Sequence, residues 1–334
     1  MTAATALSRR SALMLLGATA AASTVGQARQ ATASPLQRLA FYGPPAGPTI
    51  TLAHAVAAEH FADIADEPSV QIWRNPDELR AGLTSGTIAL SIVPVQAAAN
   101  LYNRGFPIRL ANVMTNGLLY VIARDPQIGS IADLAGRRVA VPFRGDTPEI
   151  IFQRLLAHHG LSGEGEVEIL FSGSPIEAMQ LALAGRVDAA LTAEPSTTAG
   201  ILRGRSAGVE VRRAIDIQAA WGEMTSAAAV LPQAGLAVTQ AFLDDASSTL
   251  PAIQQALKEA ATDVNAEPEV AAAHATDALR IPAPLLAASI PGSNLVARAA
   301  GEARSDIERM LGAMAGDGLD RIGGRLPDDG FYVG

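Results

Sequence analysis

Short β-type runs alternate with helical segments along most of this chain, and this alternation constrains the fold more than any other feature. Leu39–Tyr42, Ile88–Val93 and Arg138–Val141 are examples of such runs. The first and third end in turns rich in glycine and proline, and after the second Pro94 directly starts a helical segment. Alternation of this kind is typical of α/β domains whose sheets are largely parallel. We therefore predict an α/β fold.

Strand and helix patterns form two successive βα sets, followed by a mostly helical C-terminal region. We predict a helix over Thr49–Ala65, a loop around Trp221, and a return strand over Ala234–Val238. Beyond that strand, we predict helices over Ala241–Leu243, Leu250–Asn265, Glu269–Ala278 and Ala297–Ala313.

The first 33 residues have the pattern of an export signal. Arg9-Arg10 precedes an apolar run over Ala12–Ala22, and small residues follow, with cleavage patterns ending at Ala28 or Ala33. A basic segment, a short apolar segment and such a site describe a secretory signal, and the paired arginines indicate twin-arginine export. We predict that residues 1–33 are removed and that the remaining chain is soluble.

The composition excludes several classes of function. The chain has no cysteine, which excludes disulfides, thiolate metal sites, a cysteine nucleophile and a lipid anchor on cysteine. Loss of Arg9, Arg10 and Arg29 with the signal leaves 22 basic residues of the original 25 against 33 acidic ones, a net charge of −11. We predict no binding to nucleic acid or to anionic membrane surfaces.

The sequence contains no recognisable catalytic or metal-binding set. The five histidines all fall inside predicted helices, and His54 and His60 are six residues apart, which does not place them on one helix face. The zinc-protease, nucleophile-elbow and dinucleotide patterns are absent. We predict that the histidines pack or lie on surfaces, that the protein is not an enzyme, and that it needs no metal or cofactor.

The loops that follow the predicted strands carry the candidate ligand contacts, because ligands of open α/β sheets bind at the carboxyl ends of strands. The segment Arg144–Pro148 has the most features suited to binding a ligand. Gly145 allows close backbone approach, Asp146 or Thr147 can cap the helix that Pro148 begins, and Arg144 adds a planar cation for an anionic group. The alternative is that Asp146 and Thr147 only cap the helix and that Arg144 pairs with a surface acid.

Glu194 has two possible roles. Its carboxylate can accept a hydrogen bond from a ligand amine or ring N–H, or it can lie at a helix start where the helix dipole favours an acid. The other candidate ligand residues lie at strand ends or in the loops between elements: Gly43, Pro44, Trp73, Pro94, Asn116, Gly117 and Gln233.

Three segments resemble the periplasmic substrate-binding proteins of ABC importers, in the group of nitrate, sulfonate, taurine and thiamine-pyrimidine-precursor receptors. They are Ala81–Leu90, Ser130–Val141 and Ala184–Ala190, and the second, SIADLAGRRVAV, is the most specific. The resemblance implies the type II periplasmic binding fold, with residues 34–118 and 236–334 in one lobe and residues 119–235 in the other. It also implies hinges near Leu119–Ala123 and Gln233–Val238.

The resemblance implies a free periplasmic receptor, expected to be a monomer, that captures a small organic or anionic solute between its lobes. An inner-membrane ABC permease would be its partner. Two alternatives stay open: a solute-sensing receptor subunit, and a pyrimidine-precursor synthase on the same fold. That synthase would be expected to use a cysteine-containing iron motif, which this chain lacks.

Overall fold

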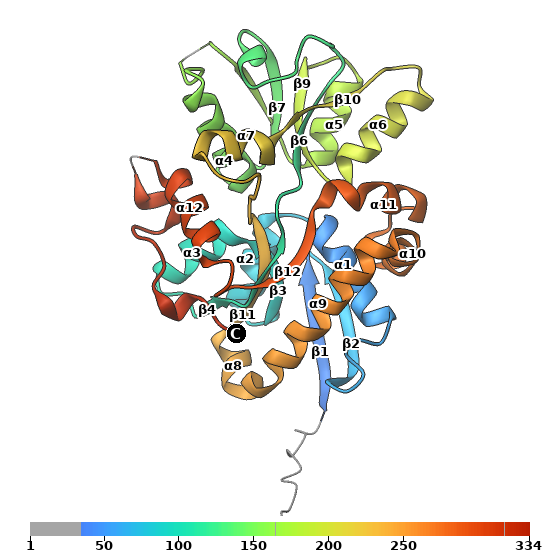
Figure 1. Cartoon of the computed structure of the whole chain (residues 1–334), viewed down its shortest axis with the longest axis vertical. Helices are drawn as coiled ribbons and strands as arrows, with labels where there is room; N and C mark the ends of the chain where they lie inside the picture. Colours follow the sequence, from blue (N-terminus) through green and yellow to red (C-terminus); the bar gives the residue numbers. More distant parts are fainter. Residues whose placement is uncertain (1–34, 164, 317) are drawn as a thin grey trace, which may run out of the picture. The chain divides into compact units, whose positions relative to one another are not determined.

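Two mixed β-sheets organise the part of the chain that the computed structural model describes, which is residues 35–163, 165–316 and 318–334 (Figure 1). The predicted export signal lies outside these residues. The seven-stranded sheet contains β1 (Leu36–Gly43), β2 (Ala65–Ile72), β3 (Leu90–Pro94), β4 (Ile108–Leu110), β5 (Asn112–Thr115), β11 (Ala234–Thr239) and β12 (Leu295–Ala299). The five-stranded sheet contains β6 (Leu119–Ala123), β7 (Arg138–Pro142), β8 (Glu168–Ser172), β9 (Ala189–Ala193) and β10 (Arg212–Asp216).

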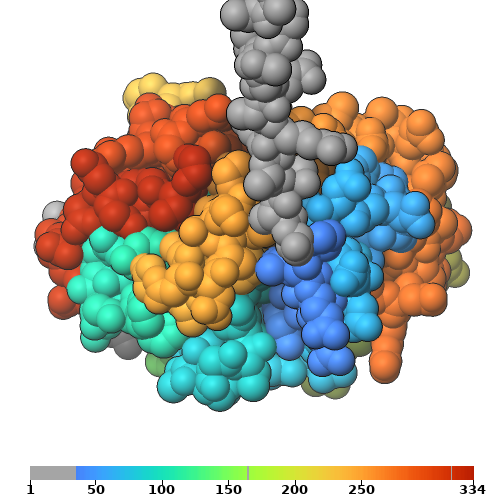
Figure 2. Space-filling view, turned by 90° about the horizontal axis from the view of Figure 1, so that it is seen from below, coloured from blue at the N-terminus to red at the C-terminus, as the bar shows by residue number. Residues whose placement is uncertain are grey.

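Each sheet and its helices form one lobe. The first lobe has the seven-stranded sheet with α1 (Gly47–Ala57), α2 (Pro76–Ser85), α3 (Val95–Asn103), α8 (Gln240–Ala246), α9 (Leu250–Ala266), α10 (Pro268–Leu279), α11 (Ala283–Ser289) and α12 (Arg304–Ala315). The second lobe has the five-stranded sheet with α4 (Thr147–His158), α5 (Pro175–Leu183), α6 (Ser196–Ser206) and α7 (Ile217–Thr225). Figure 2 shows that the first lobe joins distant parts of the chain, since blue N-terminal and orange C-terminal segments lie side by side.

The cores of both sheets are parallel, as predicted, but the strands that connect the lobes are not. β1 pairs in parallel with β2 and β3, and β7 pairs in parallel with β8 and β9. In contrast, β11 is antiparallel to β3, and β6 is antiparallel to β9. These two strands enter their sheets directly from the other lobe rather than through a crossover helix, so nothing requires them to run parallel.

The inner strands are buried on both of their faces, as expected for sheets covered on both sides. In β7, Val139 and Val141 pack into the core cluster on one face of the sheet, and Ala140 packs into a second cluster on the other face. Because successive side chains point to opposite faces, a continuous apolar run indicates such a strand. No helix in the described ranges is both long and apolar enough to cross a bilayer.

The structure corrects several predicted elements. The helix predicted over Thr49–Ala65 ends at Ala57, because Glu59 adopts a left-handed backbone conformation (φ 60°) and Ala65 starts β2, whose residues pair with β1. Trp221 lies in α7 and is buried, rather than in a loop. The predicted helix Ala297–Ala313 is replaced by β12, which pairs with β5, and by α12. In these cases tertiary pairing and packing override local propensity.

Candidate functional site

A cavity of about 750 Å³ lies between the lobes and is lined by loops from both. In the first lobe, the lining comes from the segment after β1, the segment after β2, and Pro94 at the end of β3. In the second lobe it comes from the segments after β7, β8 and β9. These are the carboxyl ends of the parallel strands, where α/β sheets bind their ligands. The fold therefore places the cavity where the sequence predicts the ligand contacts.

The walls of the cavity are mainly apolar. The first lobe contributes a proline-rich wall. The second lobe contributes Phe143, directly after β7, and Ile176, in the first turn of α5. Trp73 also lines the cavity, but its indole N–H donates to Ser91 Oγ at 3.1 Å. The apolar lining side chains are Pro44, Pro45, Ala46, Pro48, Val70, Ile72, Trp73, Pro76, Ile92, Val93, Pro94, Leu118, Leu119, Pro142, Phe143, Pro148, Pro175, Ile176, Ala193, Ala234, Ala278 and Leu279.

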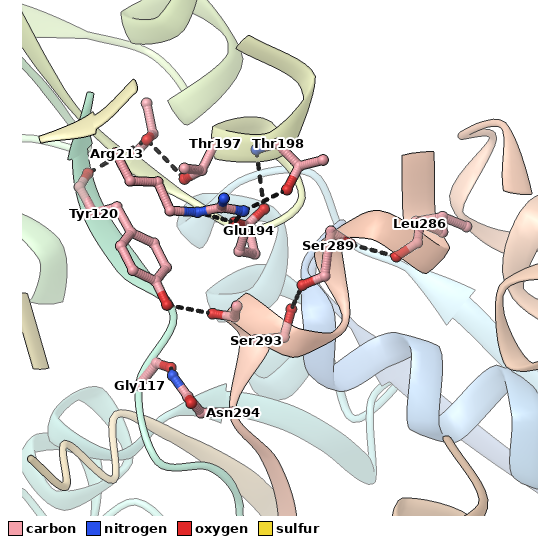
Figure 3. Close-up of polar contacts among 12 residues, drawn as sticks. Gly117, Tyr120, Glu194, Thr197, Thr198, Arg213, Leu286, Ser289, Ser293 and Asn294 are labelled. Carbon is pink, nitrogen blue, oxygen red and sulfur yellow. Dashed lines mark hydrogen bonds and ion pairs between the residues drawn. The ribbon is translucent and has the colours of Figure 1, made fainter. Parts of the chain in front are cut away.

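Glu194 lines the cavity with a carboxylate that protein groups already bind (Figure 3). Its side chain is fully buried, and Oε1 accepts from Arg213 Nε at 3.0 Å and from a terminal nitrogen of the same guanidinium. Oε2 accepts from the backbone N–H of Thr198 at 3.1 Å, in the first turn of α6. Both carboxylate oxygens are thus engaged within the second lobe, in the arrangement expected for an acid at a helix start.

Figure 3 also shows hydrogen bonds that join the lobes beside Glu194. The Tyr120 hydroxyl, at the start of β6, donates to the carbonyl of Gly292 at 2.9 Å. Burial raises the pKa of Tyr120 to about 12, so the hydroxyl keeps its proton at neutral pH. Asn294 Nδ2 donates to the carbonyl of Gly117 at 2.7 Å. These contacts hold the segment that crosses between the sheets against the turn before β12.

A second set of contacts joins the lobes through α4. Asp146 precedes α4 and makes an ion pair at 2.6 Å with Arg80 of α2. Burial raises the pKa of Asp146, and Arg80 opposes that shift. Thr147 Oγ1 donates to Gln96 Oε1 of α3 at 3.2 Å. Asp146 does not accept the expected capping bond from a backbone N–H of α4, because its carboxylate accepts from Arg80 instead.

Some predicted ligand residues line the cavity and others do not. The lining includes Pro44, Trp73, Pro94, Asp146, Thr147, Glu194 and Gln233. Gln233 Oε1 accepts from the N–H of Leu118 at 3.4 Å, so this side chain also bridges the crossing segment and the start of β11.

Five predicted residues lie outside the cavity lining: Gly43, Asn116, Gly117, Arg144 and Gly145. Arg144 is exposed, and its guanidinium stacks over the Phe171 ring at 4.8 Å. Gly145 lines a smaller neighbouring hollow of about 310 Å³. Asn116 and Gly117 form the crossing between the sheets. Gly117 has φ 119°, and a Cβ there would lie 2.1 Å from Gln218 Cγ, so glycine is needed for the crossing geometry.

The sequence prediction missed two parts of the site. Arg213 comes from β10, an element that the sequence pattern did not predict, and its role depends on Glu194 lying beside it. The end of α10, Asp277–Arg280, also lines the cavity, although it is distant in sequence from every strand-end loop. The lining residues Ser174 and Pro175 have a signal in the sequence. A serine followed by a proline directly after a strand is typical of a helix start, and Ser174 does cap α5.

Comparison with known proteins gives one family and a consistent fold. The family model described as NMT1/THI5 like matches residues 70–271. No curated protein matches the sequence. Among solved structures, the chain is similar to an ABC transporter protein of Parabacteroides distasonis, with a TM-score of 0.72, 22% identity, and coverage of 89% of this chain and 99% of that one.

Two further structures with the same fold are binding proteins for small anions. The periplasmic aliphatic sulphonate binding protein of Escherichia coli has a TM-score of 0.63 at 16% identity, covering 85% of this chain and 96% of that one. The periplasmic nitrate-binding protein of Synechocystis PCC 6803 has a TM-score of 0.61 at 14% identity, covering 75% of this chain and 69% of that one. At these identities the likeness establishes the two-lobed fold.

Proposed function

Because the chain belongs to the NMT1/THI5-like family, we propose that it is an exported receptor that binds a small solute between its lobes and delivers it to an ABC importer. The observation that carries this proposal is the cavity of about 750 Å³, which strand-end loops of both lobes line. The similar sulphonate and nitrate proteins are binding proteins, which supports binding rather than catalysis.

A solute in this cavity would favour closure of the lobes, because it would contact both of them. Such a ligand shifts a population of open and closed forms toward the closed one. The ion pair of Arg80 with Asp146 and the hydrogen bond of Thr147 with Gln96 join the lobes in this structure. We expect both contacts to stabilise the closed form together with the solute. The closed form is the one that we propose docks on the importer.

The chemistry of the lining favours an organic solute over a bare inorganic anion. Two of the acidic residues at the cavity, Glu194 and Asp146, are ion-paired with Arg213 and Arg80. Apolar walls that include Trp73 suit a solute with an apolar or flat body, which a few polar groups orient. Arg74 and Arg280, both exposed at the lining, can attract an anionic group of such a solute.

We propose that Pro44, Trp73, Pro94, Thr147 and Gln233 contact the solute directly, since each lines the cavity. Glu194 and Asp146 shape the site through their ion pairs. Arg144, Gly145, Gly43, Asn116 and Gly117 remain candidates from the sequence, and their positions support a role in backbone geometry or at the rim instead.

The cellular setting is part of the same proposal. We infer twin-arginine export of a monomeric receptor to the periplasm, without a lipid anchor, from the pattern in residues 1–33 and the absence of cysteine. The proposed lobe boundaries, residues 34–118 with 236–334 and residues 119–235, are supported by the change of sheet between Thr115 and Leu119 and by the return at Ala234.

A thermal-shift screen of the full protein tests the proposal. The panel contains inorganic anions, amino-sulfonates, carboxylates and nitrogen heterocycles. A ligand that binds only the folded form adds about 2.7 kcal/mol of stability when its free concentration is 100 times Kd. We expect at least one organic solute to raise the thermal midpoint in a saturable way. If no member of the panel does so, the chain is not a receptor for these classes.

A further inference from the structure

Two histidines and an aspartate lie together in the first lobe, outside the lining of the cavity. They are His54 on α1, His60 in the turn after α1, and Asp263 on α9, and one potential ligand atom from each lies within 4.8 Å of the others. His60 Nε2 is 3.1 Å from Asp263 Oδ2, and His54 Nε2 is 3.9 Å from the same oxygen. We call these three residues the histidine cluster.

The histidine cluster exists because α1 ends earlier than its sequence pattern predicts. On a continued helix, the six-residue spacing of His54 and His60 would separate their side chains. The helix stops at Ala57, and Glu59, with φ 60°, turns the chain back. The two rings then lie 5.9 Å apart between centroids. The spacing argument against a metal site therefore does not hold.

The buried ring of His54 has a nitrogen without a partner. His54 is 4% exposed, and among the described residues its Nε2 has no hydrogen-bond partner. Its other nitrogen, Nδ1, lies 3.1 Å from Nδ1 of His274 on α10. A neutral imidazole has one donor and one acceptor nitrogen. If Nδ1–H of His54 donates to His274, then His54 Nε2 has a free lone pair directed toward Asp263.

From this geometry we propose that the histidine cluster binds a divalent transition-metal ion, with Zn²⁺ the best match, through His54 Nε2, His60 Nε2 and Asp263 Oδ2. Imidazole nitrogens with one carboxylate are a common ligand set for zinc. Zinc bonds of about 2.0–2.1 Å in a tetrahedron place ligand atoms roughly 3.3 Å apart. The distances of 3.1 and 3.9 Å lie on either side of that value. A fourth position would take water, since Asp263 is half exposed.

Neighbouring side chains are placed to orient the two imidazole ligands. His274 accepts from Nδ1 of His54 in the arrangement above, and Glu259 Oε2 lies 3.8 Å from Nδ1 of His60. Partners of this kind fix the tautomer and direction of a metal-bound histidine. We therefore expect His274 and Glu259 to act as positioning residues, and we expect a bound ion to fasten α1 and its turn to α9.

Calorimetric titration of Zn²⁺ into the chelator-treated full protein tests the site. We expect one ion per chain, and binding at least about tenfold weaker in His60→Gln and in Asp263→Asn. These residues are more exposed than His54, so their replacement leaves the helix core intact. The matched control replaces both His158 and His159, an exposed pair in the second lobe, with Gln and should bind Zn²⁺ as the wild type does.

Three further readouts make the result specific. Zn²⁺ should raise the thermal midpoint of the wild type but not of Asp263→Asn. His274→Phe should weaken Zn²⁺ binding by about 10–100-fold, the range seen when such an outer partner is lost. His60→Gln should leave solute affinity unchanged. A failure of the metal-site proposal can therefore be told apart from a failure of the proposed receptor function. The proposal is overturned if the wild type binds no Zn²⁺, or if both ligand variants bind it as tightly as the wild type.

Discussion

The cavity between the lobes and the histidine cluster differ in how their polar groups are satisfied. At the cavity, the buried carboxylate of Glu194 is bound by Arg213 and by the backbone of Thr198, and the indole N–H of Trp73 is bound by Ser91. In the cluster, a nitrogen of the buried His54 ring has no hydrogen-bond partner among the described residues. A buried polar atom without a partner is costly. The satisfied buried groups of the cavity therefore suit the apolar body of a solute, and the unpartnered nitrogen of the cluster suits a cation.

The comparison shows that a polar residue can line a cavity without being free to contact a ligand. Glu194 was a candidate from the sequence because it follows a strand, yet its oxygens bind Arg213 and α6. Its main effect should therefore be on stability. The following predictions separate such structural charges from residues that face the solute, and they run from the largest expected effect to the smallest.

Arg213→Ala should destabilise the protein most. It leaves the fully buried carboxylate of Glu194 without its cation, and because Arg213 itself is exposed, we expect a loss of about 1–3 kcal/mol. Chemical denaturation monitored by circular dichroism measures the loss. As a control, Arg138→Ala removes an exposed pair with Glu168 and should cost less than about 1 kcal/mol. Equal losses in both variants would mean that Glu194 does not depend on Arg213.

Trp73→Phe should weaken solute binding by about fivefold, close to 1 kcal/mol, because it removes part of the cavity wall. It should also abolish the change in tryptophan fluorescence that the solute causes. Trp221→Phe is the matched control, since Trp221 is buried in α7 and does not line the cavity. A fluorescence change that persists in Trp73→Phe and disappears in Trp221→Phe would place the solute elsewhere.

Arg80→Ala should weaken solute binding by roughly two- to fivefold, because it removes the ion pair with Asp146 that joins the lobes. A partly exposed pair contributes less than about 1 kcal/mol. Titration calorimetry measures the affinity. Arg38→Ala, which removes an exposed pair with Glu67 inside the first lobe, should leave the affinity unchanged. If both variants bind the solute equally well, the α2–α4 contact does not contribute to closure.

Arg144→Ala should change solute affinity by less than about twofold. The sequence made Arg144 a candidate for an anionic group, but its guanidinium lies over Phe171, and the residue is not part of the cavity lining. Titration calorimetry with an anionic solute measures whether Arg144 contributes to its affinity. A loss of tenfold or more would restore the interpretation drawn from the sequence.

Local patterns predicted the parts of the fold and site that depend on local chemistry. The strand around Val139–Val141 and the helix that begins near Pro148 follow from burial and proline placement, and they bring Thr147 to the cavity. Trp73 and Pro94 lie at strand ends for the same reason.

The remaining features depend on tertiary structure. β10 is short and carries arginines and an aspartate, so its sequence does not resemble a strand and does not mark Arg213 as part of the site. The end of α10 reaches the cavity only because the C-terminal region packs back on α1. The histidine cluster depends on one left-handed residue, Glu59, which propensity does not predict.

The central claim is that a solute is held between the two lobes, and filling the cavity from each side tests it most directly. Ala46, directly before α1, and Ala193, at the end of β9, line the cavity from opposite lobes. The measurement is calorimetric titration of one stabilising solute into the wild type, Ala46→Trp and Ala193→Trp. We predict one site in the wild type and loss of binding in both variants, with folding confirmed by circular dichroism. Unchanged binding in either folded variant would contradict capture of the solute between the lobes.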